Sequence, residues 1–423
     1  MYRNKYFDIN KLIVVIPTII DIRKRAIIIE NVTIKRRMEL ALTGENIITY
    51  TAASIFLPYI LTAITLAFIT IYIIANKQTR QLVFIHKGCS MLKLFFIYIL
   101  VIPFMYRNWL GIAVGLGMIL AFTLGLYLRS VMTRDLYERI LTMICTLSLT
   151  SAAYAITEAI ANFLFDAGHS HRISSVFSHP NYFGTIVGTV IIICAYKLLT
   201  NQQNKWFYYM VIGFNVISMY LCKSMFVFVE VFIGVVILLV IQKKHKLLIL
   251  WLSSAVLGAF LVLVVGVNLI PRLYDVTVTV SLRQKIWQLA WGQIKQSPLF
   301  GHGFMSFSYL FNTAYHNRLI PHSHSIYLDM LLNFGIVGSV LFLWYFAKYY
   351  ISVITTCFKK NNIIVGSLIL AVTGAALVHG ATDLTLLWIQ TLPLFLVILA
   401  GQGSEEKTEQ YAVALNYSNS YSN

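Results

Sequence analysis

Charged residues are scarce in this chain, and acidic residues are the scarcest among them. Only 12% of the 423 residues are charged, 58% are hydrophobic, and Asp and Glu together number 16. A soluble domain has about 25% charged residues because its surface must be hydrated. The composition therefore excludes a soluble globule, a disordered chain, a nucleic-acid-binding domain and a secreted disulfide scaffold as descriptions of the whole protein.

Cysteine is also scarce. The five cysteines lie in or beside apolar runs and have no metal-ligand spacing, so they indicate neither a zinc site nor a disulfide framework. What the chain has instead is a series of long apolar runs, with a mean hydropathy of +0.75.

These apolar runs predict membrane spans. About 20 apolar residues cross the hydrocarbon core as a helix, and backbone amides in lipid must be bonded within the span, which requires helices. We predict an all-α fold, a polytopic integral membrane helix bundle with about 11 (10–12) transmembrane helices and one long extracytoplasmic loop containing short helices. The predicted spans are 47–75, 91–106, 109–128, 140–165, 182–199, 206–222, 225–241, 247–270, 335–358, 363–380 and 384–400.

The basic residues indicate the orientation of these spans. The net charge is +17, and cytoplasmic loops of membrane proteins carry an excess of Lys and Arg. If the list of spans is right, the basic short loops all lie on one side, which is then cytoplasmic, and the long connection 271–325 lies outside. These loops are 77–87, 129–139, 197–205, 243–246 and 359–360.

The two ends of the chain are expected to differ from the membrane-embedded domain, 47–400. Residues 1–46 form a basic arm, and an odd number of spans places it outside, against the charge rule. Three explanations stay open: a span missing from the list, an arm on the inner membrane surface with 47–75 as an incomplete span, or a translation start at Met38. No signal peptide is expected, and the polar tail 401–423 is expected to be disordered.

The long outer loop is where function is expected, because long loops are uncommon. Residues 281–296 predict an amphipathic helix, since apolar residues recur there at helical spacing. Arg283, Trp287, Trp291 and Lys295 lie four apart and form a second stripe, which suits a helix at the lipid headgroups. The apolar stripe is Leu282, Ile286, Leu289 or Ala290, and Ile294.

The segment after this helix carries a family resemblance. Gly301 and Gly303 are followed by His322 and His324, and then by a helix with Gly-Ile-Val-Gly near its start. This order resembles the core of the O-antigen ligase and polysaccharide polymerase family. The ten residues between His324 and Gly335 match the family's spacing between a loop histidine and a glycine.

Two other elements extend the resemblance over residues 140 to 400. Arg283 with Trp287 is similar to the helix that precedes the family's glycine turn. Arg172 and Asn181, which follows a proline, resemble the family's earlier outer-loop element. One motif departs from the family, because Lys223 stands where an arginine is frequent, and lysine lacks the planar two-pronged donor of arginine.

The resemblance implies a membrane glycosyltransferase whose active site faces outside. It would move a glycan from undecaprenyl pyrophosphate to an acceptor sugar hydroxyl and thereby polymerise lipid-linked repeat units, in capsule or exopolysaccharide biosynthesis at the bacterial cytoplasmic membrane. The alternatives are an O-antigen or glycan ligase with the same donor, and a secondary transporter or lipid-linked glycan flippase. The implied partners are the lipid-linked glycan, the bilayer, and a chain-length regulator and a flippase of the same pathway, but no nucleic acid.

The chemistry of such a reaction selects the candidate site residues. Arginines neutralise a diphosphate leaving group by paired charge-assisted hydrogen bonds, and histidine is the commonest general base near neutral pH. Arg172, Arg283 and His324 are the catalytic candidates and are expected to lie together. We expect no metal and no cofactor, because the histidine spacing is irregular and the outer loops lack an acidic pair. The substrate-binding candidates are Lys223, His322, Trp287 and Asn181.

Several polar residues have structural as well as functional interpretations. Asn181 is expected to cap the helix that follows it, since Asn is a favoured N-cap residue. Glu158 and Glu230 lie in predicted spans, where charges are expensive. They are either functional, or neutral, or hydrogen-bonded across helices. His379 and Asp383 flank the last outer turn and are expected to form an interfacial pair or to belong to the site.

Overall fold

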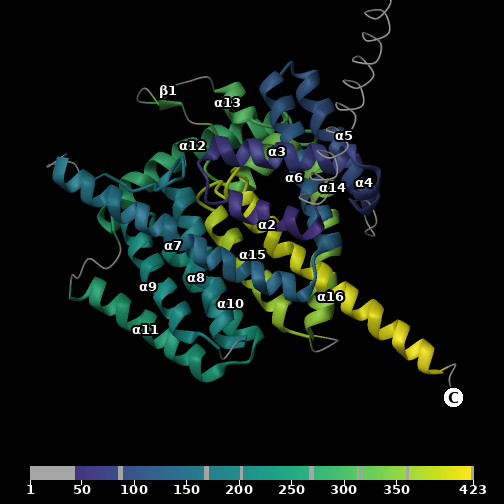
Figure 1. The fold of residues 1–423 in the computed structure, drawn as a ribbon. Coiled ribbons are helices and arrows are strands. Elements are labelled where there is room, and N and C mark those ends of the chain that lie inside the picture. The colour runs from purple at the N-terminus through teal and green to yellow at the C-terminus, as the bar shows by residue number, and fades with distance from the viewer. Residues whose placement is uncertain are drawn as a thin grey trace, which may run out of the picture. The chain divides into compact units, whose positions relative to one another are not determined.

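The computed structural model describes residues 43–83, 89–165, 171–200, 203–265, 271–311, 314–315, 318–319, 321–358 and 362–420. The chain divides into two units, Met1–Ile47 and Ile48–Asn423. Most of the basic arm 1–46 lies outside the described residues, so the three explanations for it stay open. The second unit is built of helices, with one two-stranded hairpin among its described residues (Figure 1).

The elements follow one another with short connections. In chain order they are α2 (Gly44–Ser54), α3 (Tyr59–Ala75), α4 (Lys77–Val83), α5 (Cys89–Met105), α6 (Trp109–Val131), α7 (Arg134–Phe165), α8 (Pro180–Thr200), α9 (Lys205–Leu221), α10 (Met225–Ile241), α11 (His245–Leu263), the 3-10 turn η1 (Leu273–Asp275), α12 (Val276–Gln296), α13 (Ser306–Leu310), β1 (Ala314–Tyr315), β2 (Arg318–Leu319), α14 (Ile326–Phe358), α15 (Ile364–Gly380) and α16 (Thr391–Ser420). Strand β1 pairs antiparallel with β2.

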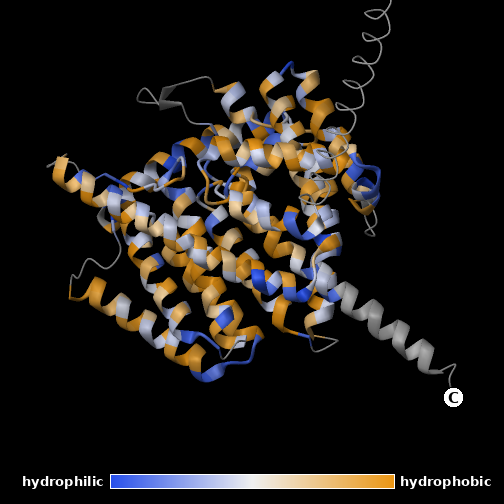
Figure 2. Cartoon of the chain, viewed as in Figure 1, coloured by the Kyte–Doolittle hydropathy of each residue, from blue (hydrophilic) through white to orange (hydrophobic). Residues whose placement is uncertain are grey.

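The helices have the composition of membrane spans, and hydrophobic residues cover most of the bundle (Figure 2). In the described residues, five helices are long and apolar enough to cross a bilayer, or six if the bent pair α3 and α4 forms one span. Helices α5, α10 and α15 are apolar but shorter. The chain is a multi-pass helical membrane protein, and the total of about 11 spans stays a prediction.

Helix α11 shows most directly that lipid is the solvent. None of its apolar window is buried in the structure. Leu250, Val256 and Leu263 are 66%, 71% and 81% exposed. Such a helix has no stable place in water, because an exposed apolar surface of this extent marks contact with a partner or a membrane.

Two predicted spans differ from the structure. Span 47–75 is interrupted, because α2 ends at Ser54 and Pro58 precedes α3 without an amide hydrogen to continue the helix. Span 384–400 begins too early, since α16 starts at Thr391. The preceding segment is irregular and is held by hydrogen bonds from Thr391 Oγ1 to the Thr385 carbonyl and from Gln390 Nε2 to the Leu57 carbonyl.

Helix α16 continues through Ser420, so it extends beyond the predicted span into the polar tail. The disorder expected for residues 401–423 stays a prediction.

Helix α12 confirms the predicted amphipathic helix and begins five residues earlier, at Val276. Ile286, Ala290 and Ile294 are buried against Phe307 and Leu332. The alternative stripe residue, Leu289, is 49% exposed, so Ala290 occupies the apolar stripe. Helix α12 thus packs on α14 along its apolar face.

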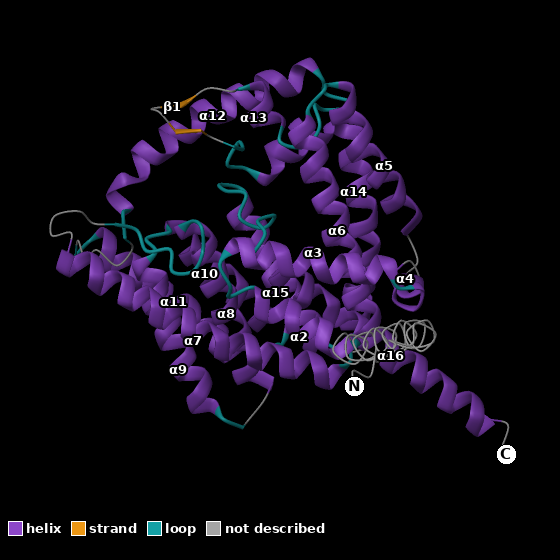
Figure 3. Ribbon diagram, turned by 45° about the horizontal axis from the view of Figure 1, so that its top comes forward, coloured by secondary structure: helices purple, strands orange, loops and turns teal. Residues whose placement is uncertain are grey.

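The glycines after α12 dock that segment onto a kink in α14. Gly335 has φ +59° within α14, and Gly301 has φ +66°. A Cβ on Gly335 would lie 2.4 Å from the Leu299 carbonyl oxygen, and one on Gly301 would lie 2.5 Å from the Gly335 nitrogen. Both positions therefore require glycine, for their backbone angles and for the close approach of two chains. Helix α14 also packs along α5, which packs along α6 (Figure 3).

Helices α8, α10 and α15 pack together and form the scaffold of the polar site. Gly188 on α8 lies beside α10, where an added Cβ would be 3.0 Å from Val227. The N-terminal ends of α8 and α10 and the C-terminal end of α15 lie at the same end of the bundle, because Thr185, Glu230 and His379 are in hydrogen-bond contact.

Candidate active site

A chain of hydrogen bonds joins four side chains from three parts of the chain that lie far apart in the sequence. Arg172 Nη2 donates to Asn181 Oδ1 over 2.5 Å, and Asn181 Nδ2 donates to Asp383 Oδ2. The other carboxylate oxygen, Asp383 Oδ1, lies 3.1 Å from His324 Nδ1. The four residues come from the loop before α8, from α8, from the loop after α15 and from the loop before α14.

Asp383 lies at the centre of this chain and is 3% exposed. Burial raises its pKa, but the hydrogen bond and charge of His324, with His322 and His379, outweigh burial and hold the pKa below its usual value. The carboxylate is therefore ionised at neutral pH. An ionised carboxylate only accepts hydrogen bonds, so His324 Nδ1 carries the proton in this contact and Nε2 of a neutral ring is the acceptor.

His324 is held by its backbone as well. It has φ +55°, in the left-handed region that non-glycine residues rarely adopt. Strain of this kind costs on the order of 1–3 kcal/mol and clusters at functional sites. The side chain is 29% exposed, so the ring reaches solvent while its Nδ1 faces a buried carboxylate.

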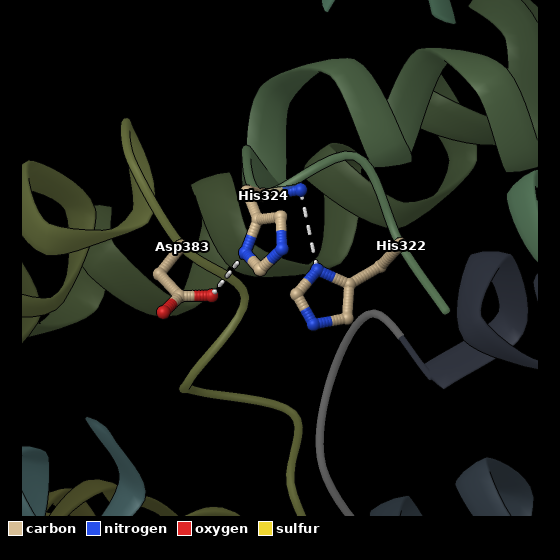
Figure 4. A group of neighbouring side chains, drawn as sticks. All are labelled: His322, His324 and Asp383. Carbon is tan, nitrogen blue, oxygen red and sulfur yellow. Dashed lines mark hydrogen bonds and ion pairs between the residues drawn. The ribbon is translucent and has the colours of Figure 1, made fainter. Parts of the chain in front are cut away.

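His322 packs on His324, with ring centroids 4.5 Å apart (Figure 4). The His324 backbone N–H donates to His322 Nδ1 over 3.2 Å. Burial lowers the pKa of His322 to about 4, and the charges of His324 and Arg283 act in the same direction. His322 is therefore neutral at pH 7, with its proton on Nε2.

Arg172 is fixed by two acceptors. Besides Asn181 it donates from Nε to the Cys222 carbonyl over 3.1 Å. The loop that carries it is anchored by Glu158, whose carboxylate accepts from the backbone nitrogens of Ser174 and Ser175 at 3.4 and 2.8 Å. Burial lowers the pKa of Arg172, followed by the charge of Arg272, but a guanidinium remains protonated at physiological pH.

Arg283 approaches the same site from α12. Its guanidinium lies 5.4 Å from the centroid of the Phe226 ring at the start of α10. Burial lowers its pKa, whereas the charge of Asp383 raises it, and the Arg283 charge in turn lowers the pKa values of Arg172 and His322. Among the described contacts, charge and not a direct hydrogen bond links Arg283 to the chain of hydrogen bonds.

The structure thus brings Arg172, Asn181, His322 and His324 together, with Arg283 in the same electrostatic environment. Lys223 follows Cys222, whose carbonyl holds Arg172, and has φ +50°. Trp287 lies one turn after Arg283, and its buried Nε1 has no hydrogen-bond partner among the described residues. No described contact joins Trp287 to Arg172 or His324.

The expected capping role of Asn181 is wrong. Helix α8 begins at Pro180, so Asn181 lies in its first turn and its side chain bridges Arg172 and Asp383. His179 takes the capping position, because its Nδ1 accepts from the Asn181 backbone N–H at 3.1 Å. Burial, and then the charge of Arg172, lower the pKa of His179, which keeps this acceptor unprotonated.

The sequence also understates Asp383. The sequence suggests an interfacial pair of Asp383 with His379, but the His379 ring pairs with Glu230, at 2.6 Å. Asp383 joins the Arg172–Asn181 part of the site to His324. The sequence signal that could have identified Asp383 is the scarcity of acidic residues, since few of them lie between the predicted spans. Arg272, whose charge acts on both site arginines, has no sequence signal beyond its charge.

The site also has the composition of a metal centre. His322, His324 and Asp383 each offer a ligand atom, and these atoms lie within 4.8 Å of one another (Figure 4). Two histidines and a carboxylate are zinc ligands in known sites. In the present arrangement both Nδ1 atoms already make hydrogen bonds. Metal independence therefore stays a prediction.

The apolar helices and a polar, arginine-containing site at one end of the bundle define a multi-pass membrane protein with a candidate active site. Residues 208–343 match the family model described as O-antigen ligase, which confirms the resemblance found in the sequence and supports a membrane glycan ligase or polymerase in general. The match includes Arg283 and His324 and ends before Asp383. A comparison with curated proteins finds no match.

Proposed function

We propose that this protein polymerises lipid-linked oligosaccharide repeat units at the outer face of the cytoplasmic membrane. It transfers the glycan from undecaprenyl pyrophosphate to a hydroxyl of an acceptor sugar. The observation that carries the proposal is the contact between Asp383 and His324, 3.1 Å long, next to Arg172 and within the field of Arg283.

His324 acts as the general base in this proposal. Its Nδ1–H points to Asp383, so the Nε2 lone pair takes the proton from the acceptor hydroxyl. Asp383 orients the ring and stabilises the imidazolium that forms, in the way an aspartate supports a catalytic histidine in other enzymes. His322 stays neutral beside it and adds no competing charge at pH 7.

The arginines act on the leaving group. As the acceptor oxygen bonds to the anomeric carbon, the bond from that carbon to the phosphate oxygen breaks and the lipid diphosphate keeps the electron pair. Its charge is stabilised by guanidinium groups that are already in place. Arg172 uses two of its five N–H groups on Asn181 and Cys222 in the described contacts, so its other N–H groups are available for phosphate oxygens.

The outer location follows from the charge pattern. The site residues lie in the connections before α8 and α14, in the connection after α15, at the start of α8 and on α12. The positive-inside rule assigns these connections, and the loop that contains α12, to the outside. A flippase or transporter is less well supported, because its substrate site is expected near the bilayer midplane between repeats.

Glycan analysis of a deletion strain tests the proposal. Loss of the high-molecular-weight ladder, with one repeat unit still attached to its acceptor, is expected for a polymerase. Long chains that accumulate on the carrier lipid would instead indicate a ligase. Repeat units that remain on the inner leaflet would indicate a flippase and overturn the proposal.

A further inference from the structure

A second polar contact lies next to the site and has no part in the reaction described above. His379 Nδ1 on α15 and Glu230 Oε2 on α10 are 2.6 Å apart, and each side chain is 2% exposed. Neither helix contains another charged residue. A lone charge inside a membrane is expensive, whereas a carboxyl and an imidazole that share one proton carry no net charge as a pair.

The pair is connected to a third helix. Thr185 Oγ1 on α8 lies 3.4 Å from the same His379 Nδ1 and donates to the Asn181 carbonyl at 3.1 Å. The contact therefore joins α8, α10 and α15. Helix α8 carries Asn181, α10 carries Phe226, whose ring lies under Arg283, and α15 precedes Asp383.

The backbone of His379 also holds the turn that carries Asp383. The His379 carbonyl accepts from the backbone N–H groups of Thr382 and Asp383, at 3.0 and 3.1 Å. The Thr382 hydroxyl donates to the same oxygen over 3.1 Å. Because Glu230 fixes the His379 ring, it also fixes the anchor from which the Asp383 carboxylate reaches His324.

We propose that Glu230 and His379 are positioning residues for the transfer reaction, and that they hold Asp383 against His324 Nδ1. The catalytic consequence rests on the proposed function, but the placement of Asp383 can be measured without any glycan. A purely structural role, in which the pair only fastens α10 to α15, makes a different prediction for a variant that replaces both residues.

That variant is Glu230→Leu combined with His379→Leu. Replacing both partners of a buried polar pair by apolar side chains is frequently neutral for stability, whereas removing one partner is strongly destabilising. The double variant should therefore fold and insert. It lacks the directional bond that fixes the His379 ring, so Asp383 should lose its fixed place. Glu230→Gln keeps an acceptor for His379 and should retain the wild-type arrangement.

The first measurement is nuclear magnetic resonance of the His324 ring in protein labelled with ¹⁵N-histidine and reconstituted in lipid vesicles. The wild-type protein and Glu230→Gln should show a hydrogen-bonded Nδ1–H resonance that disappears in His324→Gln and in Asp383→Ala. The double leucine variant should lose this resonance. The control replaces an ion pair elsewhere in the bundle, Glu138→Leu with Lys197→Leu, whose atoms lie 2.6 Å apart, with Lys197 buried and Glu138 29% exposed. This pair makes no described contact with Asp383, so the control should keep the resonance.

The second measurement is steady-state transfer by the same proteins. For the double leucine variant we expect a tenfold to hundredfold lower kcat, about what misplacement of a reacting group by roughly 1 Å costs, with KM for the donor nearly unchanged. Glu230→Gln and the control pair should remain near the wild-type kcat. If the double variant keeps both the resonance and the kcat, the positioning role is refuted. If the resonances behave as expected but the wild-type protein transfers no glycan, the proposed function fails and the placement of Asp383 stands.

Discussion

His324 and Asp383 meet across two helices: the histidine precedes α14, the aspartate follows α15, and Nδ1 lies 3.1 Å from Oδ1. Helices α14 and α15 are consecutive in the chain, and His324 and Asp383 are 59 positions apart. A base made from two segments depends on the packing between those segments. The experiments below therefore separate loss of chemistry from loss of structure.

Removal of the base should abolish long polymer. For His324→Ala we expect transfer to fall by roughly 10²–10⁴, the usual contribution of a general base, while the protein stays inserted and abundant. Asp383→Asn should have a similar though smaller effect. The chain-length distribution on glycan gels measures both. The control is His245→Ala, at an exposed position at the start of α11, and a wild-type ladder from His324→Ala would reject the assignment.

Arg283→Ala should abolish long polymer, and Arg283→Lys should restore it only partly, because lysine keeps the charge and loses the paired donors. The same order is expected at Arg172. Lys295→Ala is the matched control for Arg283, since Lys295 is an exposed cation on the same stripe of α12. Equal activity of the lysine and wild-type proteins would show that charge alone suffices.

The pH dependence of stability should show the burial of His322. Its pKa is about 4 in the folded protein and 6.5 in an exposed histidine, so between these values the unfolded chain binds a proton that the folded chain does not. Stability should therefore be constant above about pH 7 and fall as the pH drops from 6.5 towards 4, by at most about 3.4 kcal/mol at 1.36 kcal/mol per pKa unit. Thermal unfolding in lipid measures this fall, which His322→Gln should reduce. If the pH dependence of stability were the same in His322→Gln as in the wild-type protein, the burial of His322 would not be its cause.

Chelation should leave transfer unchanged if the reaction is metal-independent. Purified protein treated with EDTA should retain its rate, and elemental analysis should find well under one zinc per chain. A stoichiometric metal that is lost in His322→Ala would assign the trio of His322, His324 and Asp383 as a metal site instead.

Gly335→Ala should destabilise the protein by about 1–3 kcal/mol, the usual cost of a left-handed non-glycine residue, and by more if the backbone cannot shift. The added Cβ would lie 2.4 Å from the Leu299 carbonyl oxygen. Gly117→Ala on α6 is the control, because a Cβ there has nothing within 4 Å and alanine favours helices. Protein abundance and thermal unfolding report the difference. Equal stability of the two variants would count against the packing of the glycine turn on α14.

Where the sequence succeeds, one local pattern determines the structure. The bounds of α10 agree with the prediction because an apolar run lies between two polar turns. The predicted apolar stripe of α12 is confirmed, because the residues that recur at helical spacing are the ones that the structure buries. The interruption before α3 is missed because hydropathy averages over Pro58, although proline has no amide hydrogen to continue a helix.

The site is predicted only in part for a related reason. Arg172, Arg283 and His324 can be named from local motifs. The hydrogen bonds that join Arg172 to His324 run through Asp383, and no motif surrounds that residue in the sequence. A helix cap is enough to explain Asn181 in the local sequence, so its bridge between Arg172 and Asp383 is not predicted. Tertiary contacts over 202 positions, as between Asn181 and Asp383, leave no periodic trace in the sequence.

Helix α11 has a practical consequence for any biochemical preparation. No residue of its apolar window is buried in the structure, and α10 is a described neighbour, on which Trp251 stacks through Phe232. Acyl chains must therefore cover the rest of its surface, and α11 precedes the segment that bears Arg283. Extraction into a micelle replaces those chains, so the amphiphile chosen for purification will influence whether this arginine still reaches its substrate. Nanodiscs made from native lipid are therefore the appropriate medium in which to compare variants.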